Sequence, residues 1–173
     1  DVTNDSDTEA TGVSVKSTVY NKEGDVVSTQ TDDITVAAGK TETISQSVDV
    51  ANPKLWSVDS PNLYWVRTEI IQNGKVVDST DSRFGIRYIA TDPNSGFYLN
   101  GVHTKLNGVC EHSDLGSLGM ETYQAAVDRR IRTLKKYGVN AIRTSHNPVS
   151  PEFIEACDRL GMLVFEEAFD QWL

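Results

Sequence analysis

The sequence is poor in cysteine and has no long apolar run, and each shortage excludes a class of protein. Its 173 residues include two cysteines, Cys110 and Cys157, which lie far apart and form no CxxC pair. A disulfide framework or a cysteine-rich metal site is therefore not expected, and we interpret both residues as unpaired thiols. No apolar run approaches the roughly 20 residues that a membrane helix needs, and no signal peptide is visible.

Positive charge is also scarce. The chain has 16 Lys and Arg against 25 Asp and Glu, which gives a formal net charge of -9. An acidic surface argues against nucleic acid or an anionic membrane as the main partner. The chain opens at Asp1 without a Met and stops at Leu173 shortly after an apolar run, so both ends look cut. The compartment therefore stays open between the cytoplasm and a periplasmic or secreted location.

The first half of the sequence has the period of β-strands. Val13, Val15 and Val19 alternate with polar residues, and the stretch from Thr41 to Val50 alternates again. Asn73-Gly74 is the two-residue signature of a tight hairpin turn. About seven short strands separated by turn signals, with no helical stretch, predict a small β-sandwich up to about Tyr88.

The second half changes to alternating helices and strands. Val127, Ile131, Leu134 and Tyr137 fall on one face of a helix that Gly138 would cap. A short strand follows over residues 139–144. A second helix is expected after Ser150-Pro151, which is an N-cap serine followed by proline at the first helical position, and an apolar strand over residues 162–165 comes next. Such alternation indicates βα units and a parallel sheet, either doubly wound or part of a barrel.

Several motifs follow one another along the chain in a fixed order. They are Leu55-Trp56-Ser57, Ser60-Pro61-Asn62-Leu63-Tyr64, Phe84-Gly85-Ile86-Arg87, Phe97-Tyr98-Leu99-Asn100-Gly101, Leu106-Asn107-Gly108-Val109, the N-x-x-R-x-x-H-x-P run from Asn140 to Pro148, Cys157-Asp158-Arg159-Leu160-Gly161 and Glu166-Glu167-Ala168. Together they resemble the family 2 glycoside hydrolases, the β-galactosidase-like family. The resemblance implies a mixed fold: an all-β immunoglobulin-like sandwich over residues 1–88, then the first βα units of a (β/α)8 TIM barrel over residues 89–173.

The resemblance further implies that the parent protein is a retaining β-glycosidase acting on terminal β-D-galactosides or related β-glycosides. In that mechanism one carboxylic acid protonates the leaving oxygen while a second carboxylate attacks the anomeric carbon. The family places both glutamates after Leu173, so the fragment is expected to be inactive alone. Two alternatives stay open: a β-glucuronidase or β-mannosidase of the same family, and a non-catalytic immunoglobulin-like spacer or carbohydrate-binding module. A homo-oligomer of the full-length parent also stays open.

The fragment is expected to supply sugar-binding residues at the ends of barrel strands. By the resemblance these are His112, His146, Asn147, Glu167, Asp170 and Trp172, with Arg143 as a supporting residue that pairs with a barrel glutamate. From the residues alone, each histidine is more often a structural hydrogen-bond partner, and Trp172 is equally well interpreted as barrel packing. Reading Glu167 and Asp170 as the catalytic pair is a weak alternative, because they lie three residues apart on one loop and the family places its acids elsewhere.

No cofactor is expected from the fragment. Bacterial β-galactosidases often have Asn after the Glu-Ala pair and metal ligands beyond it, whereas Phe169-Asp170-Gln171 stands here, so a divalent cation in the parent stays open. His112 and His146 lack a third zinc ligand. Cys110-Glu111-His112 also departs from the Asn-Arg-His that the family often has. Trp56 and Trp65 are expected in the sandwich core, with a surface sugar platform as the lesser alternative.

Overall fold

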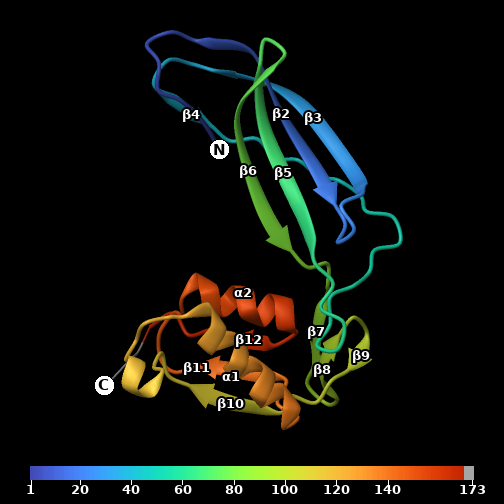
Figure 1. The fold of residues 1–173 in the computed structure, drawn as a ribbon. Coiled ribbons are helices and arrows are strands. Elements are labelled where there is room, and N and C mark those ends of the chain that lie inside the picture. The colour runs from blue at the N-terminus through green and yellow to red at the C-terminus, as the bar shows by residue number, and fades with distance from the viewer. Residues whose placement is uncertain (170–173) are drawn as a thin grey trace. The chain divides into compact units, whose positions relative to one another are not determined.

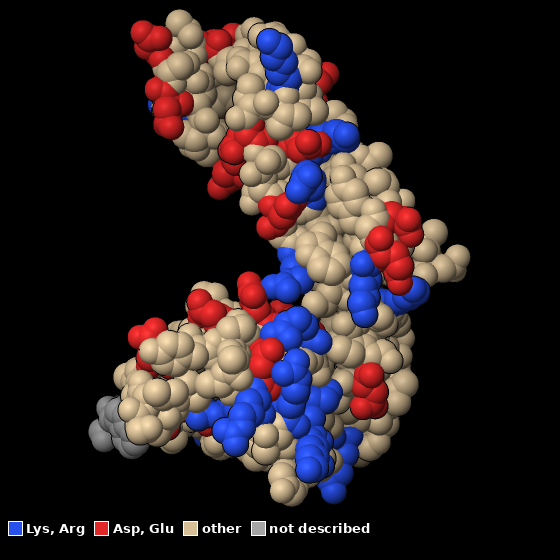
Figure 2. Space-filling model, in the orientation of Figure 1, with Lys and Arg blue, Asp and Glu red and all other residues tan. Residues whose placement is uncertain are grey.

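The computed structural model describes residues 1–169, and the chain divides into two compact units (Figure 1). Figure 2 shows acidic and basic side chains both exposed on the drawn face. The first unit comprises Asp1–Pro53 and Tyr64–Phe84, and the second comprises Lys54–Leu63 and the chain from Gly85 onward. The second unit therefore includes a short segment, Lys54–Leu63, that lies in the sequence between two parts of the first unit. No helix among the described residues is both long enough and apolar enough to span a membrane.

The first unit is built from strands only. They are β1 (Val2–Asn4), β2 (Ala10–Tyr20), β3 (Val26–Val36), β4 (Lys40–Glu42), β5 (Tyr64–Gln72) and β6 (Lys75–Phe84). The four long strands form an antiparallel sheet in the order β3-β2-β5-β6, and β1 pairs with β4 (Figure 1). Val13, Val15 and Val19 of β2 are buried on one face, as the alternation predicted.

The strand predicted from Thr41 to Val50 is wrong beyond Glu42, where β4 ends. The segment still alternates between half-buried and exposed residues, so the pattern was real. It is held by a side chain instead of a backbone ladder. Gln46 Nε2 donates to the Val15 carbonyl at 2.9 Å and to Asp32 Oδ2 at 2.8 Å, while its Oε1 accepts from Ser17 Oγ at 2.6 Å.

The second unit combines a meander with a βα layer. Its elements are β7 (Ile89–Asp92), β8 (Gly96–Leu99), β9 (Val102–His103), β10 (Gly108–Glu111), the 3-10 turn η1 (Gly116–Leu118), α1 (Gln124–Lys136), β11 (Ala141–Thr144), α2 (Pro151–Leu160) and β12 (Leu163–Phe165). Strands β7, β8 and β9 are antiparallel, and β10, β11 and β12 form a parallel sheet in that order. The sequence predicted β11 and β12 but not β10.

Both helices bury their apolar faces in one core with the sheet. That core contains Val127, Ile131, Ile142, Phe153, Ala156, Cys157 and Met162. Ser150 caps α2 as predicted, because its Oγ accepts from Phe153 N at 3.3 Å, and Gly161 ends that helix in the left-handed conformation. Tyr137 does not lie on the buried face of α1, contrary to the prediction. It is the residue at which the helix ends, and its side chain is 79% exposed.

Among residues 1–169, the opposite face of the parallel sheet is covered at its amino end. There Leu163 and Ala141 pack with a second apolar cluster formed by Trp56, Leu63 and Leu99. Trp56 is thus a core residue as expected, but of the second unit, where its Nε1 donates to the Asp158 carbonyl at 2.7 Å. The carboxyl end of this face carries polar and exposed side chains instead, and these define the candidate site.

Candidate functional site

The register of the parallel sheet brings side chains from its three strands onto one face. Cys110 of β10 lies opposite Arg143 of β11, which lies opposite Phe165 of β12. Because side chains alternate along a strand, the neighbouring residue Ile142 points to the helix side, where it is fully buried. Cys110, Arg143 and Phe165 are all exposed, so this face is open at the carboxyl ends of the strands.

Glu167 follows β12 and connects the strand ends. Its Oε1 accepts from Arg143 Nε at 2.5 Å and also contacts Arg143 Nη2, while its Oε2 lies 2.7 Å from His146 Nδ1. The backbone N–H of Glu167 donates to Thr144 Oγ1 at 2.9 Å, which fixes the start of the loop against β11. Arg143, His146 and Glu167, which the sequence named as site residues, are therefore brought together.

The 2.7 Å contact determines the state of the His146 ring. A carboxylate can only accept, so His146 Nδ1 must carry the hydrogen that it donates to Glu167 Oε2. The 3.4 Å approach of Arg143 Nη2 to the same nitrogen is then a close contact without a hydrogen bond. In the neutral ring this tautomer makes Nε2 the acceptor nitrogen. The peptide bond between Ser145 and His146 is cis.

The other predicted residues take no part in the hydrogen bonds between Arg143, His146 and Glu167. The His112 ring stands edge-on to the His146 ring, with 6.0 Å between ring centroids and an interplanar angle of 80°. Asn147 is exposed in the loop after β11. Asp170 and Trp172 lie outside the described residues. The structure thus unites two histidines, one arginine and one glutamate from three adjacent strand ends.

Electrostatics favour an ionised Glu167. Burial raises the pKa of its carboxyl, but the hydrogen bonds and charges of His146 and Arg143 together lower it more, so the net pKa lies below its usual value. The pKa of Arg143 is raised in turn by its contacts with Cys110 and Glu167. A carboxylate held in this way serves as an acceptor and is poorly suited to act as a general acid.

Cys110 is a site residue that the sequence reasoning missed. Its Sγ accepts from Arg143 Nη1 at 3.8 Å, and this contact, followed by the proximity of Ser145, lowers the pKa of the thiol. The signal that would have revealed it is its register opposite Arg143. That register depends on β10, which has four residues and no readable pattern of its own.

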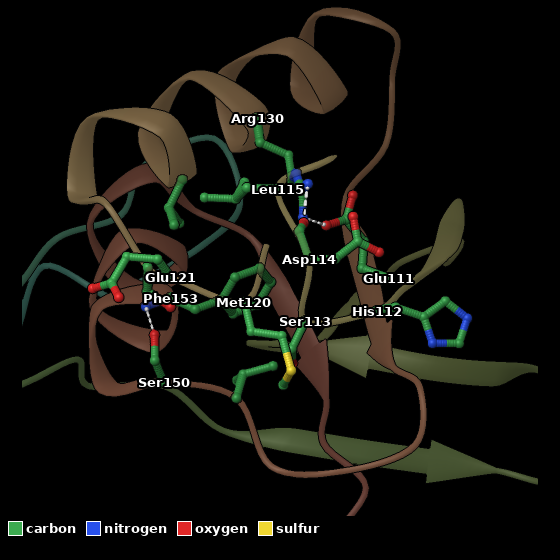
Figure 3. Close-up of a pocket in the computed structure, with 13 residues that line it drawn as sticks. Glu111, His112, Ser113, Asp114, Leu115, Met120, Glu121, Arg130, Ser150 and Phe153 are labelled. Atoms are coloured by element: carbon green, nitrogen blue, oxygen red, sulfur yellow. Dashed lines mark hydrogen bonds and ion pairs between the residues drawn. The ribbon is translucent and has the colours of Figure 1, made fainter. Parts of the chain in front are cut away.

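Glu111, the next residue, points the other way, towards α1 (Figure 3). Its Oε2 accepts from Arg130 Nη1 at 2.8 Å, and Arg130 Nη2 also donates to the Asp114 carbonyl. Burial raises the pKa of the Glu111 carboxyl despite this ion pair. The pair borders a small cavity of about 50 Å³ whose other walls include Met120 and Phe153. That volume admits water but no sugar ring.

Metal binding finds no support in the described part of the chain. Among residues 1–169, no group of three or more His, Cys, Asp or Glu side chains is placed to hold a metal ion. His112 and His146 form a ring contact without a third ligand beside them. The described residues therefore do not by themselves form a complete site for a divalent cation.

Two family models match the chain in succession. "Glycosyl hydrolases family 2" matches residues 1–87, and "Glycosyl hydrolases family 2, TIM barrel domain" matches residues 91–170. These matches confirm the mixed fold class that the sequence predicted, a sandwich followed by the start of a TIM barrel. They leave only a few residues between the two regions unmatched.

Individual relatives agree with the family models. The protein named "Beta-galactosidase BoGH2A" from Bacteroides ovatus is 41% identical over 169 residues, which is 98% of this chain and 20% of that protein. A "Putative beta-glucuronidase" from Formosa agariphila is 44% identical over 128 residues, 74% of this chain and 12% of that protein. This chain therefore spans a fifth or less of the length of these relatives.

Solved structures of the family are similar to this chain. A glycosyl hydrolase family 2 member from Bacteroides cellulosilyticus superposes with a TM-score of 0.88 at 42% identity, covering 92% of this chain and 22% of that one. A Bacteroides uniformis β-glucuronidase gives a TM-score of 0.88 at 32% identity, covering 96% and 20% of the two chains. In each case the similarity runs through both units.

Proposed function

This chain belongs to glycosyl hydrolase family 2, and from that premise we propose that it supplies one wall of the sugar site of a retaining β-glycosidase. The parent enzyme would hydrolyse terminal β-D-galactosides or related β-glycosides. The observation that carries this proposal is the network of Arg143, His146 and Glu167 at the carboxyl ends of adjacent parallel strands. Barrel enzymes bind substrate at that end of their strands.

In this proposal Glu167 positions other groups and does not react. Its carboxylate fixes the tautomer and orientation of His146, so that the Nε2 acceptor meets a sugar hydroxyl. Arg143 holds the same carboxylate ionised and adds positive charge near the reaction centre, which would also favour the ionised form of a nucleophilic glutamate. The acid/base and nucleophile glutamates are then other residues, which the family pattern places after Leu173.

The remaining contacts follow from position. His112 stands against His146 and would reach the same sugar, and Asn147 offers both a donor and an acceptor from the adjoining loop. Asp170 and Trp172 are proposed as further sugar contacts on sequence grounds. We also propose a boundary near residue 88 between the sandwich and the barrel, with a carbohydrate as the partner of the whole protein.

A β-glucuronidase is the second candidate, because several relatives carry that name, including the Formosa agariphila protein that is 44% identical. The two candidates differ in the group at C5 of the sugar, which is a hydroxymethyl in galactose and a carboxylate in glucuronate. They predict the same binding wall from this chain. The preferred sugar separates them.

The test follows the histidine ring signals of the 173-residue chain by NMR while methyl β-D-galactoside or methyl β-D-glucuronide is added. The signals of His112 and His146 should shift, whereas that of His103, whose ring lies 5.4 Å from the Tyr98 ring in the meander, should not. His146→Ala should abolish binding, and His103→Ala is the matched control. If neither sugar moves His112 or His146, the proposed wall is wrong.

Turnover provides an independent check. A panel of chromogenic aryl β-glycosides should not be hydrolysed by the 173-residue chain, because its Glu167 is engaged by Arg143 and His146. Turnover that disappears on Glu167→Gln would mean that Glu167 itself is a reacting group. The positioning role assigned to Glu167 would then be wrong.

A further inference from the structure

A separate hollow lies within the first unit, on the face of its four-stranded sheet opposite Val15 and Val19. Its volume is about 380 Å³. It is lined by Tyr20, Asn21, Lys22, Gly24, Trp65, Arg67 and Asp81, and we call it the Trp65 hollow. No role in the proposed glycosidase reaction is assigned to it, because all its lining residues belong to the first unit.

Strand pairing explains why two aromatic residues meet there. Tyr20 of β2 and Trp65 of β5 are direct cross-strand partners. Both are half-buried, and both line the hollow. A cross-strand aromatic pair presents a wide apolar surface at little conformational cost. On an otherwise polar sheet face, such a surface is suited to a flat ligand with apolar C–H groups.

The polar part of the hollow is an ion pair of fixed geometry. Arg67 lies two residues beyond Trp65 on the same face, and Asp81 of β6 is its cross-strand partner. Arg67 Nε donates to Asp81 Oδ1 and Nη2 donates to Oδ2, both at 2.8 Å. The two side chains remain about half exposed, at 49% and 51%. This fork does not use the Nη1 hydrogens of Arg67. The carboxylate oxygens of Asp81 also keep lone pairs, so both groups can bond with a ligand.

The turn between β2 and β3 forms the rim. Asn21 holds it closed, because its Oδ1 accepts from Asp25 N at 2.8 Å and its Nδ2 donates to Asp25 Oδ2 at 3.0 Å. Lys22 and Gly24 lie on this turn and are exposed. The hollow is thus preformed by a hairpin turn and an ion pair, and binding would not need a large rearrangement.

We propose that the Trp65 hollow is a carbohydrate-binding site that takes a pyranose ring of a neutral oligosaccharide. The ring would pack its C–H face on Trp65 and Tyr20, and two neighbouring hydroxyls would bond with Arg67 and Asp81. Each hydroxyl both donates and accepts, so a vicinal pair matches a guanidinium next to a carboxylate. Asp81 neutralises Arg67, so the ion pair itself gives no preference for an anionic ligand.

The test uses the indole N–H signals of the 173-residue chain in NMR, with β-1,4-galactotetraose as the ligand. The chain has three tryptophans, so each signal can be assigned by a single substitution. The Trp65 signal should shift on titration, whereas that of Trp56, buried in the other unit, should stay in place and report an intact fold. Sorbitol has hydroxyls but no ring to stack, so it should leave Trp65 unmoved.

Variants assign the shift to the hollow. Arg67→Met should weaken the titration of Trp65 about tenfold or more, the size expected for a lost hydrogen bond to a charged group. Tyr20→Leu should also weaken it, because it removes one of the two aromatic faces on which the ring packs. Glu69→Gln is the matched control, because it breaks the Lys16–Glu69 ion pair on the same sheet face outside the hollow. That variant should bind as the unaltered chain does.

The outcome is independent of the site at the strand ends. His146→Ala should leave the Trp65 titration unchanged, so failure of one proposal does not imply failure of the other. The inference is overturned if galactotetraose leaves the Trp65 signal unmoved. It is equally overturned if sorbitol produces the same shift, or if both Arg67→Met and Tyr20→Leu titrate like the unaltered chain.

Discussion

The two thiols should differ in alkylation rate by about three orders of magnitude, although they occur in one unit of one chain. Cys157 is 1% exposed in the core between the helices and the sheet, and burial raises the pKa of its thiol to about 12. Cys110 is exposed at the end of β10, where Arg143 and Ser145 lower the pKa of its thiol. Only the thiolate attacks an alkylating reagent, so the pKa difference becomes a rate difference.

The magnitude follows from the ionised fractions. At about pH 8 a thiol with a pKa of about 12 is ionised to roughly one part in ten thousand. A thiol at the ordinary value of 9.0 is ionised to roughly one part in ten, and Cys110 lies below that value. The ratio is about a thousandfold before access is considered, and the burial of Cys157 widens it further.

Iodoacetamide labelling followed by peptide mass spectrometry measures both rates in one sample. Native protein should show fast labelling at Cys110 and almost none at Cys157, and urea should bring the two rates together. Arg143→Met should slow Cys110, whereas Arg132→Met removes an exposed arginine of α1 and should change nothing. Comparable labelling of both thiols in the native protein would refute the reasoning, as would an unchanged Cys110 rate in Arg143→Met.

Three further changes test the fold and the network. Ile131→Ala should lower the free energy of unfolding in urea by about 3 kcal/mol, because Ile131 is fully buried and its loss leaves a cavity; a loss well under 1 kcal/mol would contradict that packing. Ser150→Ala should cost about 1 kcal/mol in the same assay, because it removes the side-chain cap of α2. For Glu167, whose folded pKa is lowered by His146 and Arg143, ionisation stabilises the fold above the unfolded pKa of about 4.5 and this is lost as the pH falls through the folded pKa. The melting temperature of Glu167→Gln should therefore fall less between about pH 6 and pH 3 than that of the unaltered chain. An equal fall would argue against the network.

Local signals in the sequence predicted local structure well. Asn73 and Gly74 both have the positive φ that their hairpin requires, and Ser150 and Gly161 cap the second helix as expected. These features depend on the conformational preferences of a few adjacent residues. Periodicity alone left open whether the βα units form a barrel or a doubly wound sheet. The family motifs favoured the barrel.

Features that depend on distant contacts were harder to predict. Whether the segment after Glu42 joins a ladder was decided by Gln46 and its partners on two other strands, which its alternation does not encode. Cys110 belongs to the site because strand pairing places it opposite Arg143, and this pairing cannot be read from the sequence around Cys110. Trp56 was predicted in the sandwich core because it lies among the sandwich residues in the sequence. Its contact with Leu163 shows that it belongs to the core of the second unit.

The segment Lys54–Leu63 imposes an order of events during translation. The first unit can close as soon as Phe84 is available, yet this segment leaves it and belongs to the unit that follows. Trp56 can contact Leu163 only after roughly 100 more residues have been synthesised. Their synthesis takes about 5–20 s at the usual speed of a ribosome. For that interval Trp56 lacks its contact with Leu163 and its hydrogen bond to the Asp158 carbonyl. A nascent chain stalled before β12 should therefore be more prone to chaperone capture than one stalled after it.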